Sequence, residues 1–137
     1  MIRVVIDTSV FVRYLIRPSA ATRTLIEDLW MDDVIRVVVA PELVEELEGV
    51  LQRPRLRQWI RPDEGQVLLD VIARKAEMMR RLGPVPSYTR DPKDDKFVAC
   101  ALVGGASSII TTDTDLLALT SLAGVSIVTP EAFVEGL

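Results

Sequence analysis

Four short runs of apolar, mostly β-branched residues recur along this chain, and segments with helical spacing of apolar residues separate them. The runs cover residues 2–6, 34–40, 107–112 and 125–129. A run that is apolar on both faces of an extended backbone is typical of a central strand in a parallel sheet. Parallel neighbours also need long crossover connections. The sequence therefore predicts βαβ units folded as a three-layer α/β/α sandwich around a central, mainly parallel sheet.

Proline, glycine and capping residues indicate where the intervening helices start and stop. Helices are expected at residues 10–16, 41–53, 63–79, 93–103 and 115–122, with a last short helix from Pro130. Ser19 can cap a further segment that stops at the Asp32-Asp33 turn, and residues 55–60 are expected to form a short helical link. Residues 82–90, which contain one glycine and two prolines, are expected to form an irregular loop.

The length of 137 residues suits one domain, residues 1–137, which can bury a core without disulfides. No apolar stretch approaches the roughly 20 residues that a membrane span needs. We also recognise no secretory signal, so a cytoplasmic protein is expected. Cys100, the only cysteine, lies between two alanines in an apolar helical segment, where we expect a buried, inert thiol.

A carboxylate accompanies each of the first three apolar runs and the most apolar helix. Asp7 and Asp113 follow strands directly, Glu46 lies in the helix after the second run, and Asp94 precedes the apolar helix. Ligands of parallel sheets bind beyond the carboxyl ends of the strands, so these groups are expected to converge there. Gathered carboxylates repel one another unless cations compensate, and the pattern predicts a metal-binding pocket. Helix capping is the alternative role for Asp7 and Asp115.

The absence of histidine narrows the chemistry further. Serine-histidine and cysteine-histidine nucleophile systems have no base in this chain, and a zinc site of the usual cysteine and histidine kind cannot be built. If the protein is an enzyme, carboxylates with a hard divalent cation are the expected means of catalysis.

Two acidic segments leave the choice of ligand open. Glu46 and Glu48 both flank the apolar face of their predicted helix, and periodicity alone does not choose between them. In the later segment, Asp94 lies one turn before packed positions, whereas Asp91 is expected to start an Asp-Pro turn. Asp95 is expected to be either solvated or a secondary ligand.

The charge balance is acidic, with a net charge of −4, which at first argues against a nucleic-acid partner. The distribution is uneven, because four arginines fall within nine residues, 53–61, that hold no acid. These arginines could simply solvate helix faces. A basic rim around an acidic pocket would instead hold a phosphate backbone.

Four stretches of the chain carry a recognisable pattern. They are VIDTSVFV at residues 5–12, APELVEEL at 40–47, RDPKDDKFV at 90–98 and ITTDTDLL at 110–117. In order and spacing they resemble the PIN domain family, and in particular the group related to VapC toxins of toxin-antitoxin systems. Two positions depart from the family pattern: Ser9 stands where asparagine is frequent, and Ala40 stands where a serine commonly precedes the helix.

The resemblance implies a site and a metal. The implied catalytic acids are Asp7, Glu46, Asp94 and Asp113, a choice that favours Glu46 over Glu48. Asp7, Asp94, Asp113 and Asp115 would hold Mg²⁺ or Mn²⁺. The hydroxyl-bearing residues expected beside these ligands are Thr8, Ser9 and Thr112.

The resemblance also implies an activity and partners. The expected activity is hydrolysis of single-stranded RNA by a toxin that binds a small antitoxin protein and forms a homodimer or higher homo-oligomer. The basic residues expected to contact RNA are Arg13, Arg53, Arg90, Lys93 and Lys96. A housekeeping RNA-processing nuclease and a non-catalytic interaction module on the same scaffold remain alternatives. A haloacid-dehalogenase-like phosphatase is disfavoured because Ser9 replaces its second acid, and a receiver domain because no lysine follows Lys96.

Overall fold

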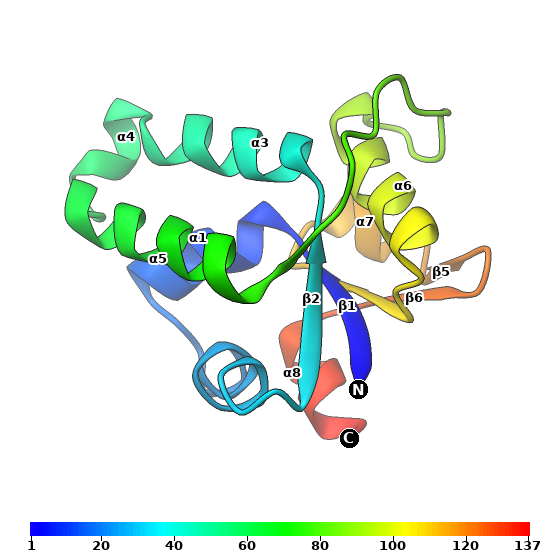
Figure 1. Cartoon of the computed structure of the whole chain (residues 1–137), viewed down its shortest axis with the longest axis horizontal. Helices are drawn as coiled ribbons and strands as arrows, with labels where there is room; N and C mark the ends of the chain where they lie inside the picture. The colour runs from blue at the N-terminus through cyan, green and yellow to red at the C-terminus, as the bar shows by residue number, and fades with distance from the viewer.

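The computed structural model describes residues 1–137 and contains a six-stranded sheet with helices on both sides (Figure 1). The strands lie in the order β3-β2-β1-β4-β6-β5. Their bounds are β1 Ile2–Ile6, β2 Ile35–Val39, β3 Glu77–Met78, β4 Ser108–Ile110, β5 Ser121–Leu122 and β6 Val125–Val128. Every neighbouring pair is parallel except β5 and β6. The mainly parallel sheet expected from the sequence is therefore confirmed.

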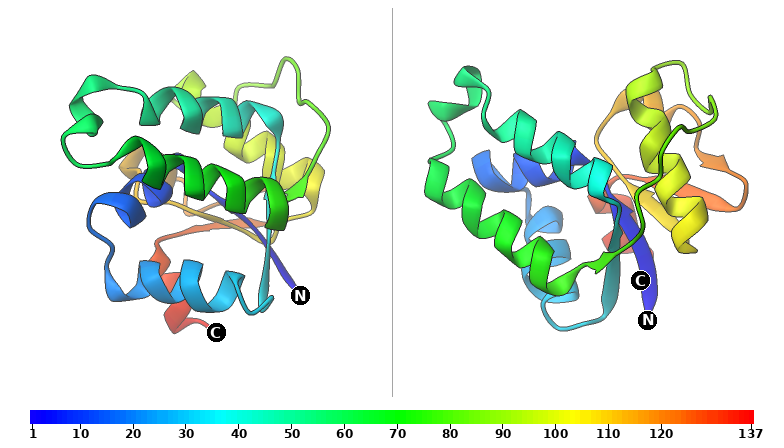
Figure 2. Two further views of the ribbon diagram at one scale, coloured as in Figure 1. Left: turned by 60° about the vertical axis from the view of Figure 1, so that its left-hand side comes forward. Right: turned by 45° about the horizontal axis from the view of Figure 1, so that its top comes forward.

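Helices cover the two faces of this sheet (Figure 2). Their bounds are α1 Thr8–Ile16, α2 Ala20–Arg23, η1 Thr24–Trp30, α3 Pro41–Leu51, α4 Pro54–Arg57, α5 Pro62–Lys75, η2 Pro92–Asp94, α6 Asp95–Gly104, α7 Thr114–Leu117 and α8 Pro130–Glu135. Helix α6 packs on β1, β2 and β4, while η1 packs on β2 and α8 on β6. The π-helix η1 continues directly from α2, which Ser19 caps as expected by accepting a hydrogen bond from the Thr22 amide.

The centre of the sheet explains why its strands are apolar on both faces. Val4 and Val5 of β1 are fully buried, and β1 is flanked by β2 on one side and β4 on the other. The order of the strands reverses at this point, because the chain moves from β1 to β2 in one direction and later adds β4 on the opposite side. Ile6 lies beside Ile110, and the Asp7 amide donates a hydrogen bond to the Ile110 carbonyl at 2.9 Å. The segments after β1 and β4 therefore leave the sheet side by side.

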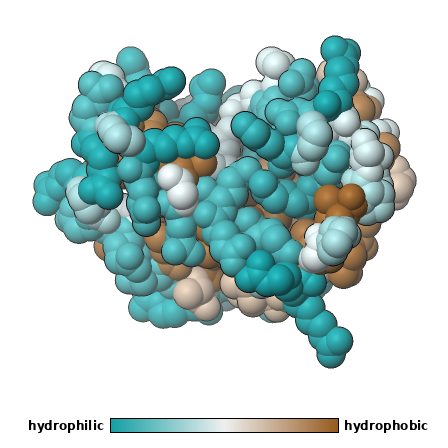
Figure 3. Space-filling model, turned by 90° about the horizontal axis from the view of Figure 1, so that it is seen from above, coloured by the Kyte–Doolittle hydropathy of each residue, from teal (hydrophilic) through white to brown (hydrophobic).

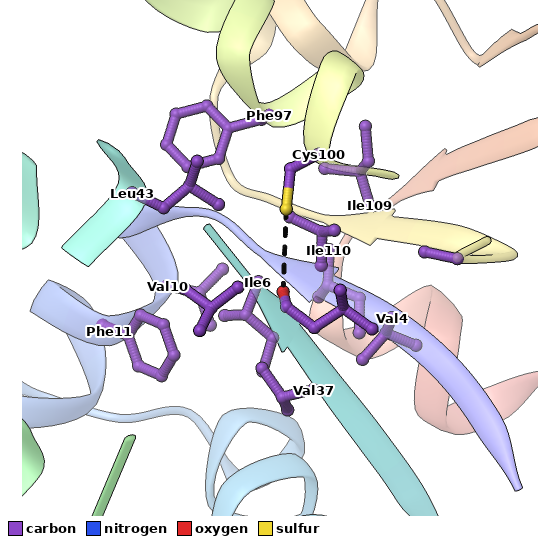
Figure 4. Packing of buried hydrophobic residues seen from close by; sticks show 14 of the residues in the cluster. Val4, Ile6, Val10, Phe11, Val37, Leu43, Phe97, Cys100, Ile109 and Ile110 are labelled. Carbon is purple, nitrogen blue, oxygen red and sulfur yellow. Dashed lines mark hydrogen bonds between the residues drawn. The ribbon is translucent and has the colours of Figure 1, made fainter. Parts of the chain in front are cut away.

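Cys100 lies inside the hydrophobic core, among side chains from β1, β4, α1, α3 and α6 (Figure 4). Its thiol is fully buried and lies 4.0 Å from the Val38 carbonyl oxygen. Burial raises the pKa of the thiol to about 12, so the sulfur stays protonated at neutral pH. The expectation of a buried cysteine is confirmed.

Helix α5 ends earlier than its apolar spacing predicts. The pattern extends to Met79, but the helix ends at Lys75 and the chain becomes extended at Ala76. Residues 77–78 instead pair with β2 as strand β3, and the Met79 amide donates to the Val39 carbonyl at 2.8 Å. Hydrogen-bonding groups on the edge of β2 thus compete successfully with continuation of the helix.

The predicted helix over residues 115–122 is also too long. Helix α7 ends at Leu117, and residues 121–122 form β5, which pairs antiparallel with β6. The turn between them places Ala123 and Gly124 at φ angles of 50° and 84°. Positive φ at both central positions suits a two-residue hairpin turn. This turn explains why residues 121–122 form strand β5 beside β6.

Two groups of helices extend beyond the carboxyl ends of the strands. Helices α3, α4 and α5 form one arm, and α6, α7 and the loop before η2 lie opposite it (Figure 1). Seen from above, the surface between the two sides is mainly hydrophilic (Figure 3). No helix combines the length and apolar character that a bilayer-spanning segment needs.

Candidate functional site

Asp7 lies where β1 ends and α1 begins, and it is 5% exposed. Although it occupies the N-cap position of α1, its side chain accepts no capping hydrogen bond from the helix backbone. Instead, the hydroxyls of Thr111 and Ser9 donate to Oδ2 at 2.6 and 2.9 Å. The capping alternative is therefore wrong for Asp7. The two hydroxyls orient the carboxylate through Oδ2 and leave Oδ1 free to contact another group.

The pKa of Asp7 lies above its usual range, chiefly because of burial. The hydrogen bonds from Thr111 and Ser9 act in the opposite direction, while the negative charges of Glu46 and Asp113 raise the pKa further. The acids that follow β1, lie in α3 and follow β4 thus affect one another electrostatically.

Asp94 is the most strongly perturbed acid. It is 6% exposed, and its Oδ2 atom is buried without any hydrogen-bond partner. Burial, followed by the charges of Asp113, Asp7 and Asp91, raises the pKa of Asp94 to about 7. A buried carboxylate oxygen without a donor is costly. This oxygen and the surrounding negative charge together suit a cation.

Glu46, rather than Glu48, faces this group of acids. The Thr8 hydroxyl donates to its Oε2, and Lys96 Nζ lies 2.8 Å from its Oε1. Glu46 and Lys96 each retain 23% side-chain exposure. Glu48 instead lines a polar cavity near the tip of the arm, together with Arg57. The contact across α1, α3 and α6 resolves a choice that helical periodicity left open.

Asp94 also belongs to a second acidic group, together with Asp91 and Asp115. One carboxylate oxygen from each of Asp91, Asp94 and Asp115 lies within 4.8 Å of the others. Asp115 is exposed, and its amide donates to Asp113 Oδ1 at 2.9 Å. The carboxylate of Asp113, and not that of Asp115, therefore caps α7.

Asp91 was missed as a site residue because its Asp-Pro pair predicts a turn. That turn exists, since Asp91 Oδ1 accepts a hydrogen bond from the Lys93 amide at 3.0 Å. The turn nevertheless places the carboxylate beside Asp94 and Asp115. The Asp-Pro signal alone could not reveal this second role.

Asp95 is buried, so the expectation that it is solvated is wrong. It is 4% exposed, and its Oδ1 accepts hydrogen bonds from the Tyr88 amide and from the amide and hydroxyl of Thr89. Burial raises the pKa of Asp95, but these hydrogen bonds outweigh it and the net pKa is lowered. The carboxylate fastens the preceding loop to the start of α6.

The hydroxyls beside the acids differ in part from the expected set. Thr8 and Ser9 contact Glu46 and Asp7, as described, whereas the backbone amide of Thr112 donates to Ser9 Oγ at 3.2 Å. Thr111, which the sequence did not single out, bonds Asp7 and also accepts a hydrogen bond from the Asp113 amide at 2.9 Å. Neighbouring residues of an extended chain point to opposite sides, which explains why one threonine faces Asp7 and the next does not.

The five basic residues expected to contact RNA fall into two groups. Arg13, Arg53, Arg90 and Lys93 are exposed and form no ion pair. Lys96 is instead paired with Glu46 inside the site. The expected contact of Lys96 with RNA stays a prediction.

Comparisons with known proteins agree with this architecture. A sequence model of the PIN domain matches residues 3–115. "Uncharacterized protein MJ1680" of Methanocaldococcus jannaschii is 30% identical over 120 residues, which cover 86% of this chain and 75% of that protein.

Two solved structures share the fold. A chain of VapBC2 from Rickettsia felis, solved bound to a DNA fragment from its promoter, aligns with a TM-score of 0.59 and 12% identity over 92% of this chain and 97% of that one. The PIN domain of human SMG5 aligns with a TM-score of 0.54 and 13% identity, covering 98% and 97% of the two chains. At such low identity these structures support the fold alone. Because the family model spans most of the sequence, the chain belongs to the PIN domain family.

Proposed function

We propose that this protein is a metal-dependent ribonuclease that hydrolyses phosphodiester bonds of single-stranded RNA. PIN domains are generally metal-dependent nucleases, and the acids of this chain agree with that chemistry. The observation that carries the proposal is the Asp94 carboxylate, buried with an unpartnered oxygen among the charges of Asp7, Asp91 and Asp113. Such an arrangement is stabilised when a cation replaces the missing donors.

The donor set fits a hard divalent cation. Asp7, Asp94, Asp113 and Asp115 supply only carboxylate oxygens, the ligands that Mg²⁺ and Mn²⁺ prefer, and Asp91 lies close enough to Asp94 and Asp115 to join those two. When bound, such a cation lowers the pKa of water and stabilises charge on a reacting phosphate.

The remaining side chains would position the reactants. Ser9 and Thr111 hold Asp7 in one orientation, and Thr8 and Lys96 hold Glu46 at the border of the pocket. We propose that Glu46 orients the attacking water and accepts its proton. Lys96 would hold the Glu46 carboxylate in place, because its ammonium group lies beside that carboxylate.

Within the nuclease assignment, we propose a toxin that pairs with a small antitoxin and acts in the cytoplasm as a homodimer. A mainly apolar hollow of about 490 Å³ lies between α1, η1 and α5, lined by residues such as Leu15, Ile26 and Val67. It would accept an apolar helix of the antitoxin. Growth arrest on expression of the chain alone, relieved by the adjacent gene product, would distinguish a toxin from a housekeeping nuclease.

Cleavage of labelled single-stranded RNA tests the central proposal. The protein is incubated with RNA and Mg²⁺, Mn²⁺ or EDTA beside Asp7→Asn and, as a control, Asp32→Asn at an exposed position outside the acidic group. We expect metal-dependent cleavage that Asp7→Asn reduces by several orders of magnitude and Asp32→Asn leaves unchanged. Stability of Asp7→Asn should be unchanged or higher, since one repelling charge is removed.

Two results would contradict the proposal. Cleavage that persists in Asp7→Asn would point to a contaminating nuclease. Absence of both cleavage and calorimetric metal binding would favour the alternative of a non-catalytic interaction module on the PIN scaffold.

A further inference from the structure

A hollow lies one helical turn beyond the acidic pocket, along the line where α1 and α3 pack together. Thr8 of α1 and Glu46 of α3 contact each other in the pocket. Val12 and Val50, each four residues further along the same helices, both line the hollow. Residues four apart share one face of a helix, and four residues span about 6 Å. The hollow therefore lies next to the Thr8–Glu46 contact, about one helical turn from it, rather than elsewhere on the molecule.

The far end of this hollow is basic. Its volume is about 580 Å³, and its remaining lining residues are Arg53, Pro54, Arg55 and Leu56. Both arginines are exposed, and neither forms an ion pair with an acidic side chain. By contrast, Arg81 elsewhere on the surface is paired with Glu45. Two free guanidinium groups over apolar walls are complementary to a phosphate backbone whose sugars and bases pack below it.

We propose that this hollow binds the single-stranded RNA next to the scissile phosphate, with Arg53 and Arg55 contacting backbone phosphates. This inference rests on the proposed ribonuclease activity and adds to it the path of the substrate. It also explains how a chain with a net charge of −4 holds a polyanion: the acids are confined to the cleavage pocket, and unpaired arginines begin about two turns away.

The neighbouring Arg57 provides a matched control. It lies on the same short helix α4 and is also exposed, but it lines the polar cavity near Glu48 and not the hollow. Charge reversal at Arg57 changes net charge and helix composition as much as reversal at Arg55. Only the position relative to the proposed RNA path differs.

Cleavage of two substrates tests the proposal. The single variant Arg55→Glu, its matched control Arg57→Glu and the double variant Arg53→Glu/Arg55→Glu are compared on a single-stranded RNA oligonucleotide and on bis-p-nitrophenyl phosphate, a phosphodiester too small to reach the hollow. We expect the double variant to lose about tenfold or more in kcat/KM on RNA, mostly through KM, with unchanged hydrolysis of the small diester. Arg57→Glu should behave as wild type on both.

Binding provides a readout that does not need cleavage. Trp59 is 62% exposed and follows α4, whereas the only other tryptophan, Trp30, is 1% exposed. RNA titrated into Asp7→Asn protein should therefore change the emission of Trp59. In the arginine double variant, the salt dependence should become shallower by about 1.4 in log K per log salt, since each phosphate contact on a single strand contributes about 0.7.

The outcomes separate this inference from the proposed function. If wild-type protein cleaves RNA and the double variant and Arg57→Glu lose equal amounts of kcat/KM on RNA, RNA binding in the hollow is contradicted, whereas the nuclease proposal stands. Loss of small-diester hydrolysis in the double variant would indicate damage to the acidic site itself. In that case RNA binding is measured with Arg53→Gln/Arg55→Gln, which removes the two charges without reversing them. Unchanged RNA binding in this variant would also overturn the inference. If the double variant changes its oligomeric state but still binds RNA, the hollow serves self-association instead of RNA binding.

Discussion

Thr111 shows how one residue after a strand can organise a site. Its hydroxyl donates to Asp7 and accepts from the Asp113 amide, so it connects the ends of β1 and β4. Asp94 has no comparable donor for its buried Oδ2. The environments of the two acids thus differ. Hydroxyls orient Asp7, whereas the Oδ2 atom of Asp94 would be stabilised by a cation or a proton.

Asp94 should make stability depend on pH when no divalent metal is present. Its folded-state pKa of about 7 exceeds the ordinary value of 3.8, so the folded state binds the proton more tightly. The associated stability is present below about pH 4 and is lost as pH rises toward 7. Relative to Asp94→Asn, we expect wild type to lose about 1–3 kcal/mol, a value discounted because the pocket meets solvent.

Urea unfolding in EDTA between pH 4 and pH 8 measures this difference. Comparison with Asp94→Asn removes the contributions of distant carboxylates, which both proteins share, so the difference reports Asp94 together with the acids that interact with it, Asp7, Asp91 and Asp113. Parallel stability profiles for the two proteins would show that Asp94 titrates normally.

At the scale of elements, the close approach of α6 to β2 and to the residue after β3 depends on Gly104. A Cβ atom at this position would lie 2.5 Å from Cγ1 of Val38 and 2.7 Å from the sulfur of Met79. The Gly104 carbonyl also accepts hydrogen bonds from Arg3 Nε and Nη2, at 2.9 and 2.7 Å. The absence of a side chain thus lets the end of α6, which starts beside the acids, pack directly against the sheet.

Two glycine substitutions should change stability in opposite directions. Gly104→Ala is expected to destabilise the fold by about 1–3 kcal/mol because Val38 cannot move away freely. Gly49→Ala, in the exposed interior of α3 with no atom within 4 Å of the added Cβ, should stabilise it by about 0.5–1 kcal/mol through helix propensity. Denaturant midpoints of the two variants and wild type measure both effects; a neutral Gly104→Ala would contradict the packing argument.

At the scale of the whole molecule, the acidic group is assembled from two sides, the helical arm and the elements around α6. Glu46 comes from α3, whereas Asp94 and Asp115 come from the opposite side. The Lys96–Glu46 ion pair already connects these sides. A cation held by carboxylates of the pocket would reduce repulsion that otherwise opposes closure of the fold.

Divalent metal should therefore raise thermal stability. At a metal concentration of 100 times Kd the expected gain is about 2.7 kcal/mol. For a domain of this size that corresponds to a rise in Tm of several degrees. Calorimetric melts in EDTA, Mg²⁺ and Mn²⁺ measure the effect, with Asp7→Asn expected to lose most of it and Asp32→Asn to keep it. Equal shifts in all three proteins would indicate non-specific salt effects.

Local sequence patterns predicted the central strands and most helices, because burial on both faces and helical spacing are properties of a few consecutive residues. They did not predict β3 or β5. Residues 77–78 follow a helical pattern but pair with β2, and residues 121–122 follow another but form a hairpin. Pairing energy from a distant strand decided both cases, and such partners are invisible to local periodicity.

The sequence by itself determined that acids stand at the ends of buried strands and that histidine chemistry is absent. Only the tertiary structure decided which acids meet. Glu46 was separated from Glu48 by contacts from α1 and α6, and Asp91 joined the pocket while Asp95 turned to the loop. Spacing along a chain places a side chain on one face of its own element, but the neighbours of that face depend on how separate elements pack.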